Sequence, residues 1–211
     1  MSHERTPGRT TLDSDEQIAA DHAASTQGTQ VGPTAEGLRR LVDLVGPDPS
    51  VLELGSGPGP GWDADHLEAL GARVRRTDGA QASCDPQAAR GRRAELLDAV
   101  VDPFTDDRWP SYDAVVALCL LLHVERDLTA GLLSRAADAL RPDGVFLASL
   151  REGEGEGETW EHGASGNAYH VTSWPRPDLD DALRTAGLEP RWHARSVHGD
   201  ERWLTVLAVR A

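Results

Sequence analysis

The chain of 211 residues contains no lysine, only two cysteines and no long apolar run. Without lysine, the Gly-x4-Gly-Lys-Ser/Thr loop that cradles nucleoside triphosphates is excluded. Cys84 and Cys119 are too few for a disulfide framework, which favours a reducing, cytoplasmic location. Because Cys119 lies in an apolar segment, we expect it to be a small packed residue. No stretch approaches the roughly 18–20 apolar residues of a membrane-spanning helix, so no membrane partner is predicted.

Positive charge is also scarce, because 35 acidic residues outnumber 21 arginines and the net charge is −14. Nucleic-acid binding draws most of its affinity from Lys and Arg, so a nucleic-acid partner is disfavoured. The arginines between residues 73 and 93 form either a local basic patch or a solvated edge, which we favour. They are Arg73, Arg75, Arg76, Arg90, Arg92 and Arg93. The eight histidines show no tight ligand spacing with nearby carboxylates, so no metal site is predicted.

The most informative segment joins an apolar run to a series of glycines. Residues 51–54, Val-Leu-Glu-Leu, are typical of a buried strand, and residues 55–59, Gly-Ser-Gly-Pro-Gly, follow directly. Glycines at alternate positions indicate a tight turn where the backbone approaches a ligand closely. A dinucleotide-binding fingerprint needs a small residue in its third slot, where this chain has Pro60 or Trp62. A nicotinamide cofactor is therefore disfavoured.

Four further segments follow the glycines in a fixed order. They are a strand at 72–77 ending in Asp78, a strand at 94–97 followed by Asp98, a strand at 112–118 continuing to 122–124, and a helix-to-strand turn with a strand at 140–147. With the glycine segment, these motifs resemble those of the class I S-adenosylmethionine-dependent methyltransferases over residues 32–150. The resemblance implies an α/β fold, a three-layer Rossmann-like sandwich around a seven-stranded, mostly parallel sheet with one antiparallel strand.

The expected organisation is a disordered tail at 1–13 followed by a single methyltransferase domain at 14–211. The domain divides into N-terminal cap helices (14–46), a cofactor-binding core (47–150), a substrate loop or lid (151–177), and a last helix with a closing hairpin (178–211). Within the lid, we interpret the Gly/Glu repeat at 152–158 as a flexible linker. Pro86 should leave at most a short helix between residues 80 and 90.

The resemblance also implies S-adenosylmethionine as the cofactor and S-adenosylhomocysteine as its product. Glu53 would face the cofactor's ammonium group and Asp78 would hold the ribose hydroxyls, although a polar strand end and a turn acid are their alternative roles. Asp98 would lie near the adenine, with Asp102 as the alternative. The predicted cofactor-binding residues are Glu53, Gly55, Ser56, Gly57, Gly59, Asp78, Gly79, Asp98, Ala99, Ala117 and Leu118.

For the reaction, we predict an enzyme that transfers a methyl group to a small-molecule acceptor such as a specialised metabolite. His123 is the leading candidate for a general base, although a packing or cofactor-contacting role is slightly preferred. The candidate substrate residues are His22, Trp160, Tyr169 and His170. The alternatives are a methyltransferase acting on a peptide, a protein or RNA, and a non-catalytic cofactor-binding module. The oligomeric state stays open.

Overall fold

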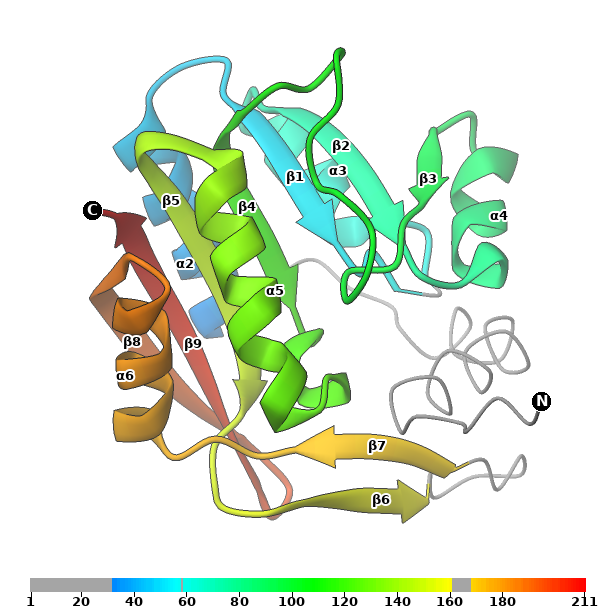
Figure 1. The fold of residues 1–211 in the computed structure, drawn as a ribbon. Helices are drawn as coiled ribbons and strands as arrows, with labels where there is room; N and C mark the ends of the chain where they lie inside the picture. The colour runs from blue at the N-terminus through cyan, green and yellow to red at the C-terminus, as the bar shows by residue number, and fades with distance from the viewer. Residues whose placement is uncertain (1–31, 58, 161–167) are drawn as a thin grey trace, which may run out of the picture.

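The computed structural model describes residues 32–57, 59–160 and 168–211. It contains a seven-stranded sheet with the order β3-β2-β1-β4-β5-β9-β8 (Figure 1). The strands are β1 (Ser50–Leu54), β2 (Arg73–Asp78), β3 (Ala94–Leu96), β4 (Tyr112–Leu118), β5 (Leu140–Arg151), β8 (Leu188–His198) and β9 (Glu201–Arg210). Neighbouring strands are parallel except where β9 pairs with β5 and β8. The predicted mostly parallel sheet with one antiparallel strand is confirmed.

Helices cover both faces of this sheet (Figure 1). The helices α5 (Arg126–Ala139) and α6 (Arg176–Thr185) pack on one face, and α2 (Gly32–Val45) and α3 (Trp62–Ala69) pack on the other. Strands and helices alternate along the chain, which is the connectivity that yields a parallel sheet between two helical layers. No helix in the described ranges is both long and apolar enough to cross a membrane.

The central strands are buried on both faces, and alternate residues serve the two layers. Leu52 of β1 packs in the cluster that contains Leu132 of α5. Its neighbour Val51 packs in the opposite cluster, with Leu38 of α2 and Leu67 of α3. Burial on both faces explains why β1 and β4 are mostly apolar in the sequence, with Glu53 and Asp113 as their charged residues.

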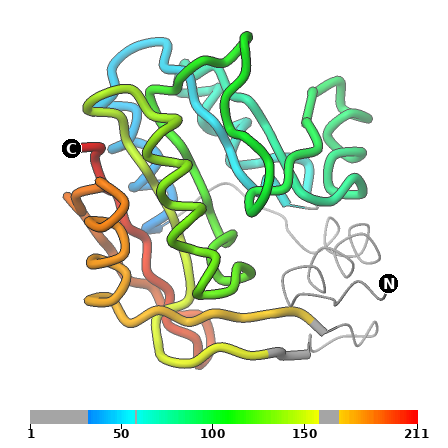
Figure 2. The backbone as a smooth tube through the Cα atoms, in the orientation of Figure 1, coloured from blue at the N-terminus to red at the C-terminus, as the bar shows by residue number. Residues whose placement is uncertain are grey.

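The predicted C-terminal hairpin is present, and Figure 2 shows β9 returning beside β5 to the end of the chain. The short helix expected around Pro86 is α4 (Gln81–Ala89), which lies beside β2 and β3. Because Pro86 has no N–H to donate, it weakens the helical ladder, and the helix ends three residues later. Of the N-terminal cap helices expected at 14–46, the part before residue 32 lies outside the described residues.

A second, two-stranded sheet lies between β5 and α6 in the sequence. Its strands β6 (Glu156–Trp160) and β7 (Ala168–Thr172) are antiparallel and run across the carboxyl edge of the main sheet (Figure 1). The interpretation of residues 152–158 as a flexible linker is therefore wrong from Glu156 onward. The base of the excursion is closed by hydrogen bonds from Gly153 N–H to Trp174 O (3.2 Å) and from Trp174 N–H to Arg151 O (3.0 Å).

Candidate functional site

The glycine segment forms a loop between β1 and α3 at the carboxyl edge of the sheet. Gly57 has a φ of 73°, a left-handed conformation that residues other than glycine rarely adopt, and a Cβ there would meet no atom of the described residues within 4 Å. Open space beside bare backbone is what a bound ligand would need. Two backbone donors fix the loop on β2, because Ser56 N–H bonds Thr77 O (2.9 Å) and Gly57 N–H bonds Asp78 Oδ2 (2.8 Å).

Asp78 ends β2 directly beside this loop and is buried. Its Oδ2 accepts from Gly57 N–H and its Oδ1 accepts from Ala80 N–H at 2.9 Å. Two backbone donors therefore orient the carboxylate, and Gly79 follows it without adding a side chain. The structure brings together Asp78 and the glycine loop, as the sequence predicted.

Glu53, the last residue but one of β1, is only 3% exposed. Its Oε2 accepts from Ser56 Oγ, whereas its Oε1 is buried and finds no hydrogen-bond partner among the described residues. Burial, followed by the nearby carboxylate of Asp63, raises the pKa of Glu53 to about 8. A buried oxygen without a partner at the base of the loop fits a cationic group, so the residues present fit the ammonium end of S-adenosylmethionine.

Asp63 is a residue of this site that the sequence analysis missed. It lies in the first turn of α3, and its Oδ1 is buried without a partner in the described part of the chain. Burial raises the pKa of Asp63 to about 6. An acid at this position is ordinarily explained as a partner of the helix dipole, so the sequence gives no signal of its burial beside Glu53.

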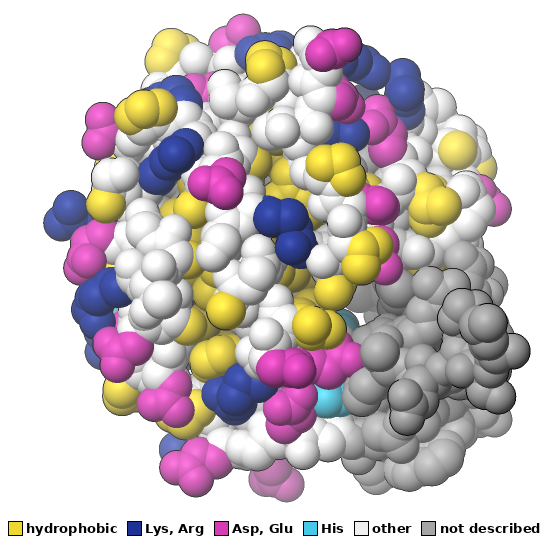
Figure 3. All heavy atoms as spheres, in the orientation of Figure 1, with side chains coloured by type: hydrophobic (Ala, Val, Ile, Leu, Met, Phe, Trp, Pro, Cys, Tyr) yellow, Lys and Arg dark blue, Asp and Glu magenta, His cyan; other side chains and the backbone are white. Residues whose placement is uncertain are grey.

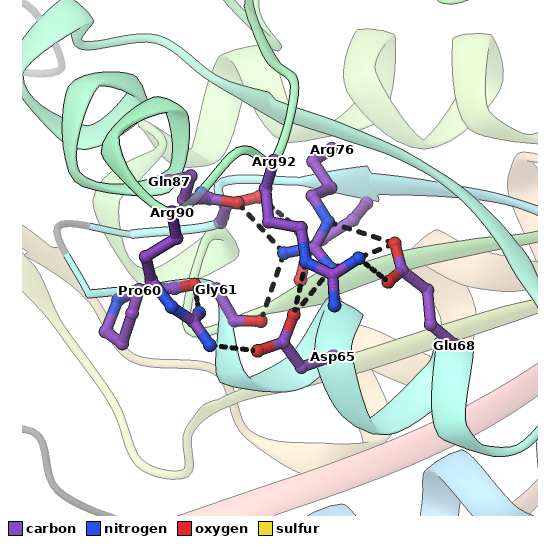
Figure 4. A network of polar contacts seen from close by, with 10 residues as sticks. Pro60, Gly61, Asp65, Glu68, Arg76, Gln87, Arg90 and Arg92 are labelled. Atoms are coloured by element: carbon purple, nitrogen blue, oxygen red, sulfur yellow. Dashed lines mark hydrogen bonds and ion pairs between the residues drawn. The ribbon is translucent and has the colours of Figure 1, made fainter.

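The far end of the loop is held by a network of charged side chains around Arg76 (Figure 4). Arg76 is 2% exposed, and its guanidinium pairs with Asp65 (2.7 Å) and Glu68 (2.9 Å) of α3. It also donates to Gly61 O at 3.4 Å, and Arg90 donates to Pro60 O. The interpretation of these arginines as a solvated edge is therefore wrong for Arg76, which is buried beside the glycine loop.

Gly61 shows how closely this network meets the loop. A Cβ on Gly61 would lie 2.5 Å from Gln87 Oε1 and 2.6 Å from Arg76 Nη1, and the residue has a φ of 80°. Only glycine satisfies both conditions, because any side chain would displace the network and strain the backbone. Gly59 is buried nearby, whereas Gly55 has a φ of 70° and lies against Leu120.

The predicted adenine side lies after β3. Asp98 Oδ1 accepts from Val100 N–H (2.9 Å), and Asp98 N–H donates to Asp102 Oδ2 (2.8 Å). Both acids thus belong to one turn, so the two alternatives for the adenine contact are neighbours. Ala99 is buried in this turn, and its carbonyl accepts from Arg135 Nη2 at 2.6 Å.

The end of β4 contributes a different type of surface. The side chain of Ala117 is buried in the core, so only its backbone is available to a ligand. Leu118 is half-buried. Cys119 follows with a φ of 54°, and its N–H donates to Ser149 O at 2.9 Å. Cys119 is exposed, so the expectation that it is a small packed residue was wrong. Surrounding protein atoms still raise the pKa of the Cys119 thiol by desolvation.

His123 lies beyond β4, in the short 3-10 helix η1 (Leu121–His123), where it meets β7. Its Nδ1 is 3.1 Å from His170 O, and its ring contacts Tyr169 edge-on with centroids 5.7 Å apart. The structure therefore brings together the candidate general base, His123, and one candidate substrate residue, Tyr169. The side chain of Trp160 and the whole of His22 lie outside the described residues.

His170 has a different environment from Tyr169, because it is only 3% exposed. Thr172 Oγ1 donates to Val124 O (2.8 Å), so it accepts from His170 Nε2–H at 2.9 Å. Glu156 Oε1 of β6 is 3.1 Å from the same nitrogen. These contacts lie inside the hairpin and join it to η1, so the described position of His170 is one of a packing residue.

A groove of about 770 Å³ lies at the base of the β6–β7 hairpin, where residues 151–157 meet the β8–β9 turn. Its charged lining is largely paired, because Arg195 binds Glu152 (2.7 Å) and Arg151 binds Glu201 (3.0 Å). None of the predicted cofactor-binding residues lines it. The groove is therefore separate from the glycine loop. In the described residues, no group of three or more His, Cys, Asp or Glu side chains is placed to hold a metal ion.

A family model described as a methyltransferase domain matches residues 30–191, which is most of the chain. The protein therefore belongs to the class I S-adenosylmethionine-dependent methyltransferase family, as its motifs predicted. None of the curated proteins compared by sequence matches the chain.

Solved structures with the same fold include two methyltransferases and one cyclase. The 1,6-didemethyltoxoflavin-N1-methyltransferase of Burkholderia thailandensis, with bound 1,6-didemethyltoxoflavin and S-adenosylhomocysteine, is 23% identical, with a TM-score of 0.69 over 100% of this chain and 92% of that chain. The magnesium protoporphyrin IX methyltransferase of Synechocystis PCC 6803, with bound cofactor, is 15% identical, with a TM-score of 0.72 over 100% of both chains. The [4+2]-cyclase SpnF is 14% identical, with a TM-score of 0.68 over 100% and 98%. At these identities the likeness shows the fold alone.

Proposed function

We propose that this protein transfers the methyl group of S-adenosylmethionine to a small-molecule acceptor. The observation that carries the proposal is the glycine loop after β1. Among the described residues, this loop combines open space at Gly57 with a buried oxygen of Glu53 that has no hydrogen-bond partner. The two methyltransferases of the same fold act on small molecules according to their names. On the face of the molecule drawn in Figure 3, acidic and basic side chains are interspersed, and no continuous basic surface is seen among the described residues. This charge distribution disfavours RNA as the acceptor.

Residues at the carboxyl edge of the sheet would each bind a different part of the cofactor. Glu53 would receive the ammonium group and Asp78 the ribose hydroxyls, while the turn after β3 that contains Asp98 would lie along the adenine. Each of these acids lies in or just after the carboxyl end of a different parallel strand, so the sheet itself sets their spacing. The loop between Gly55 and Gly61 would cover the amino-acid portion with backbone.

S-adenosylmethionine supplies a methyl group on a sulfonium, which is a strong leaving group. The main task of the protein is therefore to align the acceptor and to exclude water. When His123 Nδ1–H donates to His170 O, the ring keeps its lone pair on Nε2, the form needed for a general base. We propose that His123 removes the acceptor's proton when that proton is not lost beforehand.

The β6–β7 hairpin would provide the wall of the acceptor site. It crosses the carboxyl edge beside η1, and Tyr169 presents its ring to His123 there. Arg126 anchors this wall, since it donates to Ser173 O at 2.5 Å and its guanidinium lies 4.2 Å from the Trp174 ring centroid. A flat acceptor could be stacked against Tyr169 at this point.

The direct test is to mix the purified protein with S-adenosylmethionine and measure heat by calorimetry. Binding is expected, followed by label transfer from methyl-labelled cofactor to one member of a panel of small molecules, peptides and RNA. Absence of binding by folded protein would end the proposal. Binding without product across the panel would favour a non-catalytic module or other chemistry, which the fold of SpnF makes a real alternative.

The role of His123 is tested by His123→Asn. As a general base, it should contribute a factor of roughly 10²–10⁴ to turnover, with little change in cofactor affinity. His198→Asn, in the exposed β8–β9 turn, is the matched control and should retain full activity. Equal losses of turnover and affinity in His123→Asn would assign the residue to binding instead.

A further inference from the structure

Glu156 of β6 joins three elements through one carboxylate oxygen. Its Oε1 accepts from Arg126 N–H (3.1 Å), at the start of α5, and lies 3.1 Å from His170 Nε2 of β7. Within the described chain, Glu125, the N-cap residue of α5, makes no capping hydrogen bond with its side chain. The first N–H groups of a helix need partners from outside its backbone ladder, and a carboxylate is a favourable one there. The hairpin therefore caps α5 from a separate strand (Figure 1).

The hydrogen bonds around His170 fix which of its ring nitrogens carries a proton. Thr172 Oγ1 donates its single proton to Val124 O (2.8 Å), so it can only accept from His170 Nε2, at 2.9 Å. Nε2 therefore carries the proton, and Glu156 Oε1 is within reach of the same N–H. His170 and Thr172 are 3% and 0% exposed, so their polar atoms depend on protein partners rather than on water. The side chain of His170 is thus held in one position.

The backbone of His170 makes a separate contact with η1. Its carbonyl oxygen is 3.1 Å from His123 Nδ1, and a carbonyl can only accept, so Nδ1 is the donor. The neutral His123 ring then has its lone pair on Nε2. His170 thereby connects two sets of contacts. Its side chain is bonded to Glu156 and Thr172, and its carbonyl sets the tautomer of His123.

We propose that Glu156 and His170 are positioning residues for His123, and that the bond between them holds the carbonyl which keeps the lone pair of His123 on Nε2. This rests on the proposed function, because His123 would be the general base of that reaction. Neither positioning residue needs to touch the cofactor or the acceptor. His170 acts through the ring of His123 instead of through a direct contact with the acceptor.

The base of the hairpin is held independently of this bond. Arg126 Nη2 donates to Ser173 O (2.5 Å), and its guanidinium lies 4.2 Å from the Trp174 ring centroid. His170 lies further from this base, in the middle of β7. Loss of the Glu156 carboxylate should therefore release the His170 carbonyl from its fixed position while the hairpin and the domain stay folded.

The first test reads the tautomer of His123 in ligand-free protein by nitrogen-15 NMR of the imidazole, at about pH 8.5, where unperturbed imidazoles are neutral. The His123 signals are identified by their absence from His123→Asn. We expect the Nδ1–H tautomer in the unchanged protein and a gain of the Nε2–H tautomer in Glu156→Ala. Glu156→Gln keeps an oxygen that can accept both N–H groups, so it should retain the Nδ1–H form. Glu154→Ala, an exposed acid two residues earlier in the same segment, is the matched control and should also retain it.

The second test measures turnover with the acceptor found in the label-transfer panel. Glu156→Ala should lower kcat by about 10–100-fold, part of the roughly 10²–10⁴-fold that a general base contributes, with the affinity for S-adenosylhomocysteine unchanged. Glu156→Met, which keeps the side-chain length without an acceptor oxygen, is a second variant with the same expected result. Glu156→Gln and Glu154→Ala should keep the kcat of the unchanged protein.

The outcomes separate this inference from the proposed function. The inference would be overturned by an Nε2–H ring at His123 in the unchanged protein, by an Nδ1–H ring that persists in folded Glu156→Ala and Glu156→Met, or by the same tautomer shift in Glu154→Ala. A tautomer shift without loss of turnover would also overturn it, and each of these results leaves methyl transfer itself standing. Folded protein that binds no S-adenosylmethionine would instead overturn the proposed function.

Discussion

Asp63 and Asp65 lie two residues apart in the first turn of α3, yet they face different surroundings. Asp65 binds Arg76 Nη2 at 2.7 Å and Arg90 Nη2 at 2.9 Å. Although burial raises the pKa of Asp65, these hydrogen bonds hold it below its usual value. Asp63 has an unsatisfied oxygen and a pKa raised to about 6. Residues at positions i and i+2 point away from each other on a helix, so one turn serves two purposes.

The two aspartates differ in their pairing. Asp65 is part of a paired ion network, whereas Asp63 has a buried oxygen without a partner among the described residues. The network of Asp65, Glu68 and Arg76 is complete without any ligand, so it stabilises the loop in its folded position (Figure 4). Glu53 Oε1 and Asp63 Oδ1, in contrast, are buried and have no hydrogen-bond partner among the described residues, which costs folding free energy. Substitutions should therefore have opposite consequences on the two sides of α3.

The largest effect is expected from Arg76→Met. Removing one partner of a buried ion network leaves Asp65 and Glu68 uncompensated, which should lower the free energy of unfolding by about 3–5 kcal/mol. Urea unfolding measures this. Arg73→Met on the same strand is the control, because Arg73 is 57% exposed and 3.4 Å from Asp48, and should cost at most about 1 kcal/mol. Similar losses in both would show that the network adds no special stability.

Asp78 offers an intermediate case, a buried carboxylate held by neutral backbone donors. Asp78→Ala leaves Gly57 N–H without its partner and removes the proposed ribose acceptor, so cofactor binding should weaken by about 1–3 kcal/mol. Calorimetric titration with S-adenosylhomocysteine measures this. The exposed Asp85→Ala serves as the control and should bind normally. Unchanged affinity in Asp78→Ala would show that another residue holds the ribose.

The pH dependence of stability distinguishes the two sides further. The folded-state pKa of Glu53 is about 8 against an ordinary 4.5, so the folded protein holds a proton that the unfolded chain has lost. Its contribution to stability is complete below about pH 4.5 and is lost as pH rises toward 8, by at most about 1.4 kcal/mol per pH unit. Unfolding of ligand-free protein across this range should therefore show a decline that Glu53→Gln lacks. A decline of the same slope in the variant would contradict the assignment.

The smallest effects on stability are expected when Asp63 and Asp65 are each replaced by asparagine. At about pH 8, Asp65→Asn should destabilise the ligand-free protein by about 1 kcal/mol, because Arg76 and Arg90 lose a charged partner. Asp63→Asn should leave stability unchanged or raise it slightly, because it removes a buried, unsatisfied charge. Thermal unfolding of both variants measures the difference, and the same sign for both would break the comparison.

Most of the fold was predictable because the central strands are buried on both faces and have an unmistakable apolar pattern. The strand at 112–118 was predicted with the bounds of β4, and the closing hairpin was recognised from its turn at His198–Glu201. The β6–β7 hairpin was missed because β6 begins within the Gly/Glu repeat, and glycine and glutamate are depleted in strands. β6 is a strand because it pairs with β7, which in turn contacts η1, rather than because of its own sequence preference.

The candidate site was predictable only where a motif fixes the backbone. The glycine loop and Asp78 meet as expected, since strand ends determine their positions. Arg76 and Asp63 could not be placed from the sequence, because burial of a single charge depends on which way a strand or helix is rotated. Arg75 and Arg76 are adjacent in β2 and therefore point to opposite faces, one toward Tyr112 and the other toward α3.

Because its two ends are hydrogen-bonded to each other, the segment that contains β6 and β7 can be replaced in evolution without rebuilding the domain. Trp174 returns to within hydrogen-bond distance of Arg151 and Gly153, so the chain leaves and re-enters the domain at a single point. An insertion or deletion between these residues would not alter the path of β5 or α6. Relatives could thus acquire new acceptors by replacing this one segment, while the machinery that holds the methyl donor stays untouched.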